Sequence, residues 1–158
     1  MSVFADSSAI VKLYSDEAGH DEVRALTAIA IAEIARVEVP AALWRKHRLG
    51  ELDAEEARVL TAEFEADYFG TEDDEPRFAV VGTTADVLDH AATLCATHGL
   101  RAYDAVQLST ALAARIADPH CSEIAAFDRS LRGAASAEGF DVVPAKLPTT
   151  SAGARRRR

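Results

Sequence analysis

Apolar residues occur in two patterns along this chain: short continuous runs, and longer stretches in which they recur every three or four positions. Runs of the first kind are typical of buried strands, and stretches of the second kind are typical of amphipathic helices. The first run covers residues 3–5 and stops at Asp6, and the helical spacing of Ile10, Leu13 and Tyr14 follows at once. The start of the chain therefore predicts a strand that leads directly into a helix.

The two patterns continue to alternate along the chain. Further strands are expected at 78–81, 122–127 and 140–143. Helices are expected from 21, from 35 to Gly50, over 53–68, from 83 or 84 to 95, over 100–112, and briefly after 128. The run 29–34 suits a buried strand, although its alanines leave a helix open. Strands that alternate with helices predict an α/β fold, with a mostly parallel sheet between two layers of helices.

Length and composition indicate a single domain. The chain has 158 residues, 49% of them hydrophobic, which is enough for one sizeable core and too few to suggest two. We expect the domain to cover 1–147, followed by a disordered, arginine-rich tail over 148–158. No apolar run approaches the ~20 residues of a membrane helix, and the first residues do not resemble a signal peptide. The two isolated cysteines favour reduced thiols, so we expect a cytoplasmic protein with no membrane partner.

The formal net charge of −9 is concentrated in one segment. Residues 51–76 hold eleven acidic side chains and a single base, Arg58, and so carry a charge of −10. The rest of the chain holds 15 acidic and 16 basic side chains and is close to neutral. The overall charge therefore does not exclude a nucleic-acid partner for the remaining surface.

Four carboxylates follow strands or begin helices: Asp6, Glu38, Asp104 and Asp128. Each one alone is explained by capping or by the dipole of a first helical turn. In a parallel sheet, however, strand ends and the following helix starts meet at one edge, so we expect all four in one crevice. Such like charges raise one another's pKa values unless a cation intervenes, and oxygen ligands select Mg²⁺ or Mn²⁺. This arrangement predicts metal-assisted hydrolysis of a phosphodiester bond.

The segments that carry these carboxylates are 4–14, 35–45, 100–108 and 126–131. Together they resemble the motifs of PIN-domain ribonucleases, in the family's order and spacing, and in particular those of VapC-type toxins. The resemblance runs from about residue 3 to residue 144. It implies a PIN-like three-layer α/β/α fold and a Mg²⁺- or Mn²⁺-dependent endoribonuclease, the toxin of a toxin–antitoxin pair. It also implies a homodimer that a cognate VapB-like antitoxin inhibits.

The resemblance assigns roles residue by residue. Asp6, Glu38, Asp104 and Asp128 match the family's acidic cluster, which implies that they are catalytic and hold the metal. Ser8 matches a hydroxyl that commonly supports this cluster. The four acidic positions are all intact, so the resemblance favours an active enzyme.

Other residues extend or depart from the family pattern. Glu33 stands where many members carry a small hydroxyl residue, and Ala126 stands where many carry threonine. Three basic residues are candidates for contacts with RNA phosphates beside the bound metal: Lys12, Arg45 and Arg129. A solvated helix end is the alternative explanation for the bases around Arg45.

Two other function classes compete with a ribonuclease. A haloacid-dehalogenase-type phosphatase also begins with a strand that ends in aspartate, but it requires a second aspartate where this chain has Ser8. A non-catalytic PIN-like module that binds RNA or a protein partner would keep the fold without the activity. Metal-dependent RNA cleavage that is lost when Asp6 is replaced separates an enzyme from such a module.

Overall fold

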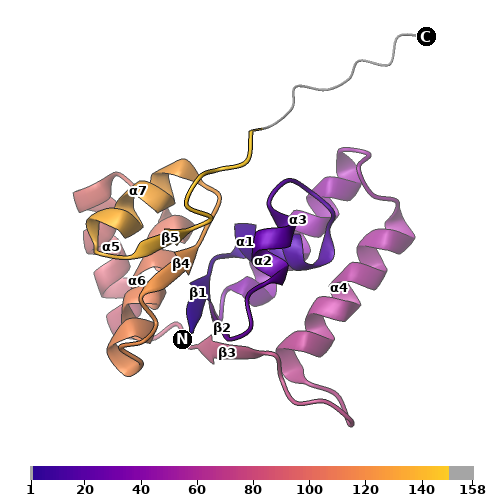
Figure 1. Cartoon of the computed structure of the whole chain (residues 1–158), viewed down its shortest axis with the longest axis horizontal. Coiled ribbons are helices and arrows are strands. Elements are labelled where there is room, and N and C mark those ends of the chain that lie inside the picture. The colour runs from indigo at the N-terminus through magenta and orange to yellow at the C-terminus, as the bar shows by residue number, and fades with distance from the viewer. Residues whose placement is uncertain (1, 150–158) are drawn as a thin grey trace.

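The structure, a computed structural model, describes residues 2–149 and contains a five-stranded sheet with helices on both faces (Figure 1). The strands are β1 (Val3–Ala5), β2 (Ile29–Ala32), β3 (Phe78–Val81), β4 (Glu123–Ala125) and β5 (Asp141–Val143). Their order in the sheet is β3-β2-β1-β4-β5, and every neighbouring pair is parallel. The expected α/β/α fold class is confirmed. Most of the predicted tail, residues 150–158, lies outside the described residues.

Seven helices connect these strands within the described part of the chain. They are α1 (Ser7–Tyr14), α2 (His20–Arg24), α3 (Ala35–Arg48), α4 (Ala54–Phe69), α5 (Ala85–His98), α6 (Ala102–Ala117) and α7 (Arg129–Ala137). Local signals set several of their ends. Thr84 caps α5 by accepting a hydrogen bond from the Val87 N–H, and Gly99 ends the same helix with φ of 64°. None of the helices in residues 2–149 has both the length and the apolar character needed to cross a bilayer.

The segment between α2 and α3 differs in part from expectation. The helical spacing from Val23 through Leu26 to Ile29 predicted a longer second helix, but α2 ends at Arg24. Ile29 belongs instead to β2, where it pairs with Val3 of β1 and Phe78 of β3. The competing strand interpretation is therefore correct for 29–32 of the run 29–34, because parallel partners on both sides satisfy the backbone of this buried part.

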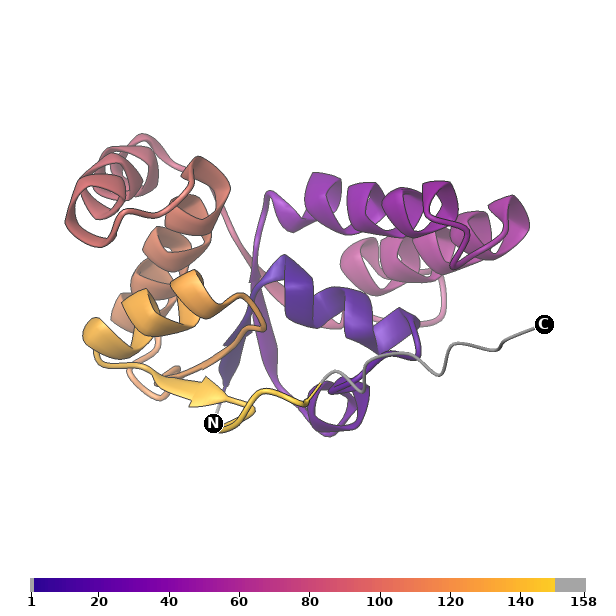
Figure 2. The ribbon, with the colours of Figure 1, turned by 90° about the horizontal axis from the view of Figure 1, so that it is seen from above.

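Alternation along the strands sorts the helices into two layers. Phe4 of β1 packs in a cluster with side chains of α5, α6 and α7, whereas Val3 and Ala5 pack in a second cluster with α1, α3 and α4. Figure 2 shows this arrangement, with α5–α7 on one side of the strands and α1–α4 on the other. Successive strand residues point to opposite faces, so a strand of three residues is enough to serve both cores.

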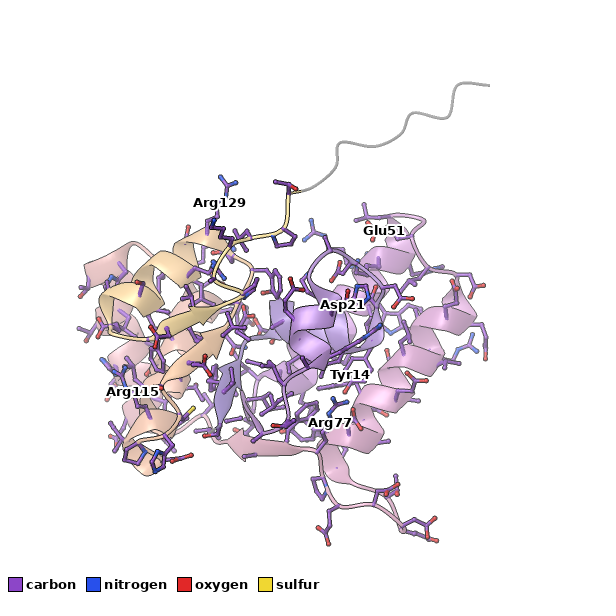
Figure 3. All side chains as sticks on the ribbon, viewed as in Figure 1. Tyr14, Asp21, Glu51, Arg77, Arg115 and Arg129 are labelled. Atoms are coloured by element: carbon purple, nitrogen blue, oxygen red, sulfur yellow. The ribbon has the colours of Figure 1, made fainter. Side chains whose placement is uncertain are left out.

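The acidic helix α4 is attached to the second layer by an aromatic and polar contact. The Tyr14 hydroxyl of α1 donates to Asp67 Oδ2 of α4 at 2.7 Å, and Arg77 pairs with the same oxygen at 3.1 Å (Figure 3). The Tyr14 ring meets Phe64 edge to face, with ring centroids 5.9 Å apart. These contacts join the most acidic segment of the chain to α1, in addition to its packing against α3.

The sheet order determines where functional side chains meet. β1 lies in the middle, parallel to β2 on one side and to β4 on the other. Just beyond β1, the Asp6 N–H donates to the Ala125 carbonyl of β4 at 3.0 Å. The carboxyl ends of β1, β2 and β4 therefore share one edge, and α1, α3 and α7 start there.

Replacing Phe64 by alanine should lower the free energy of unfolding by about 3–5 kcal/mol, since this ring is fully buried against Tyr14 and Phe78 and its loss leaves a cavity. Phe69→Ala makes the same change at an exposed position of α4 and should cost about 1 kcal/mol or less. Urea unfolding measures both. Equal losses in the two variants would show that Phe64 is not a core residue.

Candidate active site

A pocket of about 310 Å³ lies at this carboxyl edge. Its lining consists of Asp6, Ser7, Ser8, Glu38, Ala42, Arg101, Asp104, Gln107 and Asp128. The structure thus brings all four sequence-predicted carboxylates, and the predicted supporting Ser8, to one place. A larger hollow of about 620 Å³ lies between the end of α1 and α4. The convergence of carboxylates, and not size, therefore distinguishes the smaller pocket as the candidate site.

Two of the carboxylates are also helix caps. Asp6 Oδ1 accepts from the Ala9 N–H at 3.0 Å, and Asp128 Oδ1 accepts from the Leu131 N–H at 3.0 Å. Capping occupies one oxygen of each side chain and fixes its orientation at the start of α1 or α7. The capping explanation and the active-site explanation are therefore compatible, because the same bond that begins the helix aims the carboxylate into the pocket.

Asp6 and Glu38 form the inner pair of the pocket. Ser8 Oγ donates to Asp6 Oδ1 at 2.7 Å, and Ser7 Oγ donates to Glu38 Oε2 at 2.6 Å. Gln107, which is buried on α6, donates from Nε2 to the same Glu38 oxygen at 2.5 Å and to Ser7 Oγ at 2.9 Å. Hydroxyl donors from α1 and an amide donor from α6 thus hold two acidic side chains in fixed positions.

The electrostatics of the inner pair are unfavourable without a cation. The pKa of Asp6 is raised to about 7: burial is the largest cause, the nearby Glu38 carboxylate adds to the rise, and hydrogen bonds from Ser8 and the Ala9 N–H oppose it. A carboxyl group with a pKa near neutrality is far from its ordinary range and is a marker of functional sites. A bound cation would lower this pKa by favouring the ionised form.

Asp104 and Asp128 form the outer pair, and Arg101 lies between them. Arg101 Nε donates to Asp104 Oδ2 at 3.0 Å, and its Nη2 donates to Asp128 Oδ2 at 3.5 Å. Both carboxylates raise the pKa of Arg101, with the Asp104 hydrogen bond the largest cause. The pocket therefore contains two acidic pairs, one stabilised by neutral donors and the other by a guanidinium group.

The donor atoms suit a hard metal ion. Carboxylates, hydroxyls and an amide line the pocket, and oxygen ligands of this kind select Mg²⁺ or Mn²⁺ over softer metals. Within residues 2–149, no three Asp, Glu, His or Cys side chains are grouped closely enough to enclose a metal ion as they stand. In the same pocket, Arg101 supplies a positive charge to Asp104 and Asp128. Metal binding by the four acids stays a prediction.

The three predicted phosphate contacts differ in accessibility. Arg45 and Arg129 are exposed, and Arg129 projects from the edge of the molecule in Figure 3. Lys12 is buried, with Nζ 3.3 Å from Glu17 Oε1 and 4.3 Å from the centroid of the Phe127 ring. Lys12 is therefore not the open cation that the sequence suggested, and contact with a phosphate would require Glu17 to move.

The two departures from the family pattern have structural explanations. Glu33 Oε2 accepts a hydrogen bond from the Thr83 N–H at 2.9 Å, which ties the end of β2 to the loop after β3. Ala126 is fully buried, and its carbonyl accepts from Arg132 Nη1 at 2.8 Å. Neither side chain lines the pocket, so both departures leave its donor set unchanged.

Three pocket residues were missed by sequence reasoning: Ser7, Arg101 and Gln107. Arg101 and Gln107 lie three residues before and after Asp104, so the helical period places them beside it, and this signal could have found them. The contact between Gln107 and Glu38 joins residues 69 positions apart, which no local pattern reveals. Gln107 Oε1 is buried and has no hydrogen-bond partner among the described residues.

Comparison with known proteins identifies the family. The chain matches the PIN domain over residues 3–137, and it belongs to the PIN-domain family. It is 38% identical over 149 residues to Ribonuclease VapC45 and to Ribonuclease VapC49, both from Mycobacterium tuberculosis. Each alignment covers 92% of this chain and 96% of the relative. The resemblance to PIN-domain ribonucleases of the VapC type is confirmed.

Solved structures share the fold. Mycobacterium tuberculosis VapC20, described as a sarcin–ricin loop cleaving toxin, superposes with a TM-score of 0.59 at 18% identity, covering 92% of this chain and 99% of that chain. FitAcB from Neisseria gonorrhoeae gives 0.58 at 17% identity, covering 89% and 95%. A toxin–antitoxin complex from Klebsiella pneumoniae gives 0.56 at 18% identity, covering 93% and 99%. At these identities the likeness establishes a common fold.

In metal-free buffer, Asp6→Asn should be more stable than the parent protein at pH 8. The folded-state pKa of Asp6, about 7, lies above the ordinary value of 3.8, so ionisation of this side chain opposes folding. The difference should be negligible below about pH 3, where the carboxyl group is protonated in both states, and should grow to the order of 4 kcal/mol above pH 7.

Chemical denaturation in EDTA across this pH range measures the effect. Asp89→Asn, at an exposed position of α5, is the matched control because it removes one carboxylate from the surface. A parallel pH profile for the parent protein and Asp6→Asn would contradict the buried, unneutralised state of Asp6.

Proposed function

We propose that this chain is a Mg²⁺- or Mn²⁺-dependent endoribonuclease of the VapC type, which hydrolyses RNA phosphodiester bonds in the pocket at the carboxyl edge of the sheet. The observation that carries the proposal is the convergence of Asp6, Glu38, Asp104 and Asp128 from four separate helix starts into that pocket. The ribonuclease names of relatives that align over almost the whole chain support it.

The pocket residues would have two roles, metal binding and positioning of the metal ligands. Asp6, Glu38, Asp104 and Asp128 would hold the metal, which when bound supplies an activated water and stabilises charge on the pentacovalent phosphate. Ser8 keeps Asp6 in place. Gln107 and Ser7 keep Glu38 in place. These neutral donors orient the acids without adding a charge that would compete with the cation.

The protein surface around the pocket carries a few basic side chains that could contact RNA phosphates. A hollow of about 290 Å³ that shares Ser8 and Ala42 with the pocket is lined by Arg45 and Phe127. A further hollow shares Phe127 with it and is lined by Arg129. RNA phosphates on this path would meet two exposed arginines, and binding would weaken with salt as counterions are released.

The proposal includes inhibition by a cognate VapB-like antitoxin. A groove of about 590 Å³ adjoins the pocket, shares Glu38 and Ala42 with it, and exposes the apolar side chains of Val37 and Tyr103. An antitoxin segment could bury apolar residues there and place an arginine against the carboxylates, since its guanidinium matches them bidentately. The titles of two structural neighbours, a toxin–antitoxin complex and FitAcB, support a partner of this class. A homodimer, implied by the family resemblance, is part of the same proposal.

Asp6→Asn and Asp104→Asn should each reduce RNA cleavage in Mg²⁺ buffer by roughly 100-fold or more, because each removes a charged ligand of the metal that would stabilise the transition state. Purified protein, a panel of structured RNAs and mapping of the cut ends provide the measurement. Asp89→Asn should cleave at the parental rate, and EDTA should abolish cleavage by the parent.

Two results would overturn the assignment. Parental rates in both pocket variants would show that the site lies elsewhere. RNA or partner binding by the parent protein, without cleavage in either Mg²⁺ or Mn²⁺, would favour the non-catalytic PIN-like module.

The cognate antitoxin, added to Mn²⁺-loaded enzyme, should release the metal in proportion to the loss of RNA cutting. The reason is that its arginine and the metal would use the same carboxylates. Val37→Asp should weaken this inhibition, since it places a charge in the apolar groove. Full inhibition with metal retained and RNA still bound would show that the antitoxin acts from a remote surface.

A further inference from the structure

Arg101 is placed unusually for a residue of an acidic catalytic pocket. Its side chain contacts two carboxylates that come from different elements: Asp104 in the first turn of α6 and Asp128 at the start of α7. Separate nitrogens make the two contacts, Nε at 3.0 Å and Nη2 at 3.5 Å. The guanidinium group therefore bridges the outer acidic pair as a cation would.

The bridge is weak enough to be replaced. The Arg101 side chain is 78% exposed, whereas those of Asp104 and Asp128 are 17% and 34% exposed. An ion pair with so accessible a partner contributes little to stability, because water and salt screen it. Arg101 is also the residue before α6, with an extended backbone, so its side chain can turn toward solvent without any change in the helix.

Among residues 2–149, no cationic side chain forms such a bridge with the inner pair. Asp6 and Glu38 receive hydrogen bonds from hydroxyl, amide and backbone donors, all of them neutral. A divalent cation attracted by the inner pair would keep several waters, and the outer carboxylates that line the same pocket would be its nearest further oxygen ligands. It would then compete with Arg101 for Asp104 and Asp128.

We propose that Arg101 is an intrinsic counter-ion of the pocket: it bridges Asp104 and Asp128 in the metal-free protein and is displaced from both when a divalent cation binds. This inference rests on the proposed metal-dependent function. Its consequence is that Arg101 sets the concentration of divalent cation at which the pocket fills. Its role is to position the two carboxylates and to regulate their availability.

The test is calorimetric titration of the full chain with Mn²⁺ alone. Arg101→Gln should bind Mn²⁺ roughly tenfold more tightly than the parent protein, the equivalent of about 1.4 kcal/mol, because no contact has to be broken first. Arg101→Lys should fall between the two. Arg45→Gln is the matched control, since it removes the same charge near the pocket from a residue that does not line it. Its affinity for Mn²⁺ should change by less than about twofold.

Thermal unfolding gives a second readout that a purely structural arginine would not produce. Arg101→Gln should melt below the parent protein in EDTA, since two like charges lose their bridge, and the difference should vanish in saturating Mn²⁺. An equal deficit with and without Mn²⁺ would mean that Arg101 stays in place when metal binds, and would overturn the inference.

The outcomes separate this inference from the proposed function. If the parent protein binds Mn²⁺ and Arg101→Gln binds it equally or more weakly, the counter-ion role is wrong and the metal-dependent function stands. If Arg45→Gln gains as much affinity as Arg101→Gln, general electrostatics explain the gain and the bridge has no role. If neither the parent nor Arg101→Gln binds Mn²⁺, both proposals are wrong.

Discussion

The gathering of four carboxylates at one partly buried edge is the constraint on which the candidate site depends, because neighbouring like charges repel one another. Asp6, Glu38, Asp104 and Asp128 line one small pocket, and the pKa of Asp6 is raised mainly by burial, with a smaller contribution from the charge of Glu38. The protein meets this repulsion differently in its two halves. Neutral donors hold the buried inner pair, and a solvent-exposed guanidinium bridges the outer pair. A site organised in this way is prepared for a cation, since a cation relieves repulsion that no fixed group fully removes.

The fold creates this constraint through topology. All described strands are parallel and β1 is central, so the helix starts that follow β1, β2 and β4 come to one edge. Helix starts favour acidic side chains because of their free N–H groups and their dipole. The features that let Asp6 and Asp128 begin helices therefore also assemble an acidic pocket. The same hydrogen bonds therefore begin the helices and place the carboxylates in the pocket.

Much of this arrangement was predictable because its signals are local. Short apolar runs followed by a carboxylate located β1 and β4, and the alternation of patterns indicated the parallel α/β/α fold. What could not be predicted depends on distant partners. Lys12 is buried because its ammonium group contacts the Glu17 carboxylate and the Phe127 ring. The hydrogen bond from Gln107 to Glu38 joins two helices, α6 and α3, that are far apart in the sequence. The strand at 29–32 required neighbours on both sides to decide it.

Anomalous diffraction from a crystal soaked in Mn²⁺ tests the central claim most directly, because it locates the cation independently of any activity. The account predicts a Mn²⁺ peak inside the pocket, coordinated by carboxylate oxygens of both acidic pairs, with the Arg101 guanidinium turned away from Asp104 and Asp128. Ordered Mn²⁺ elsewhere on the protein, with the pocket empty and Arg101 still bridging the outer pair, would contradict it.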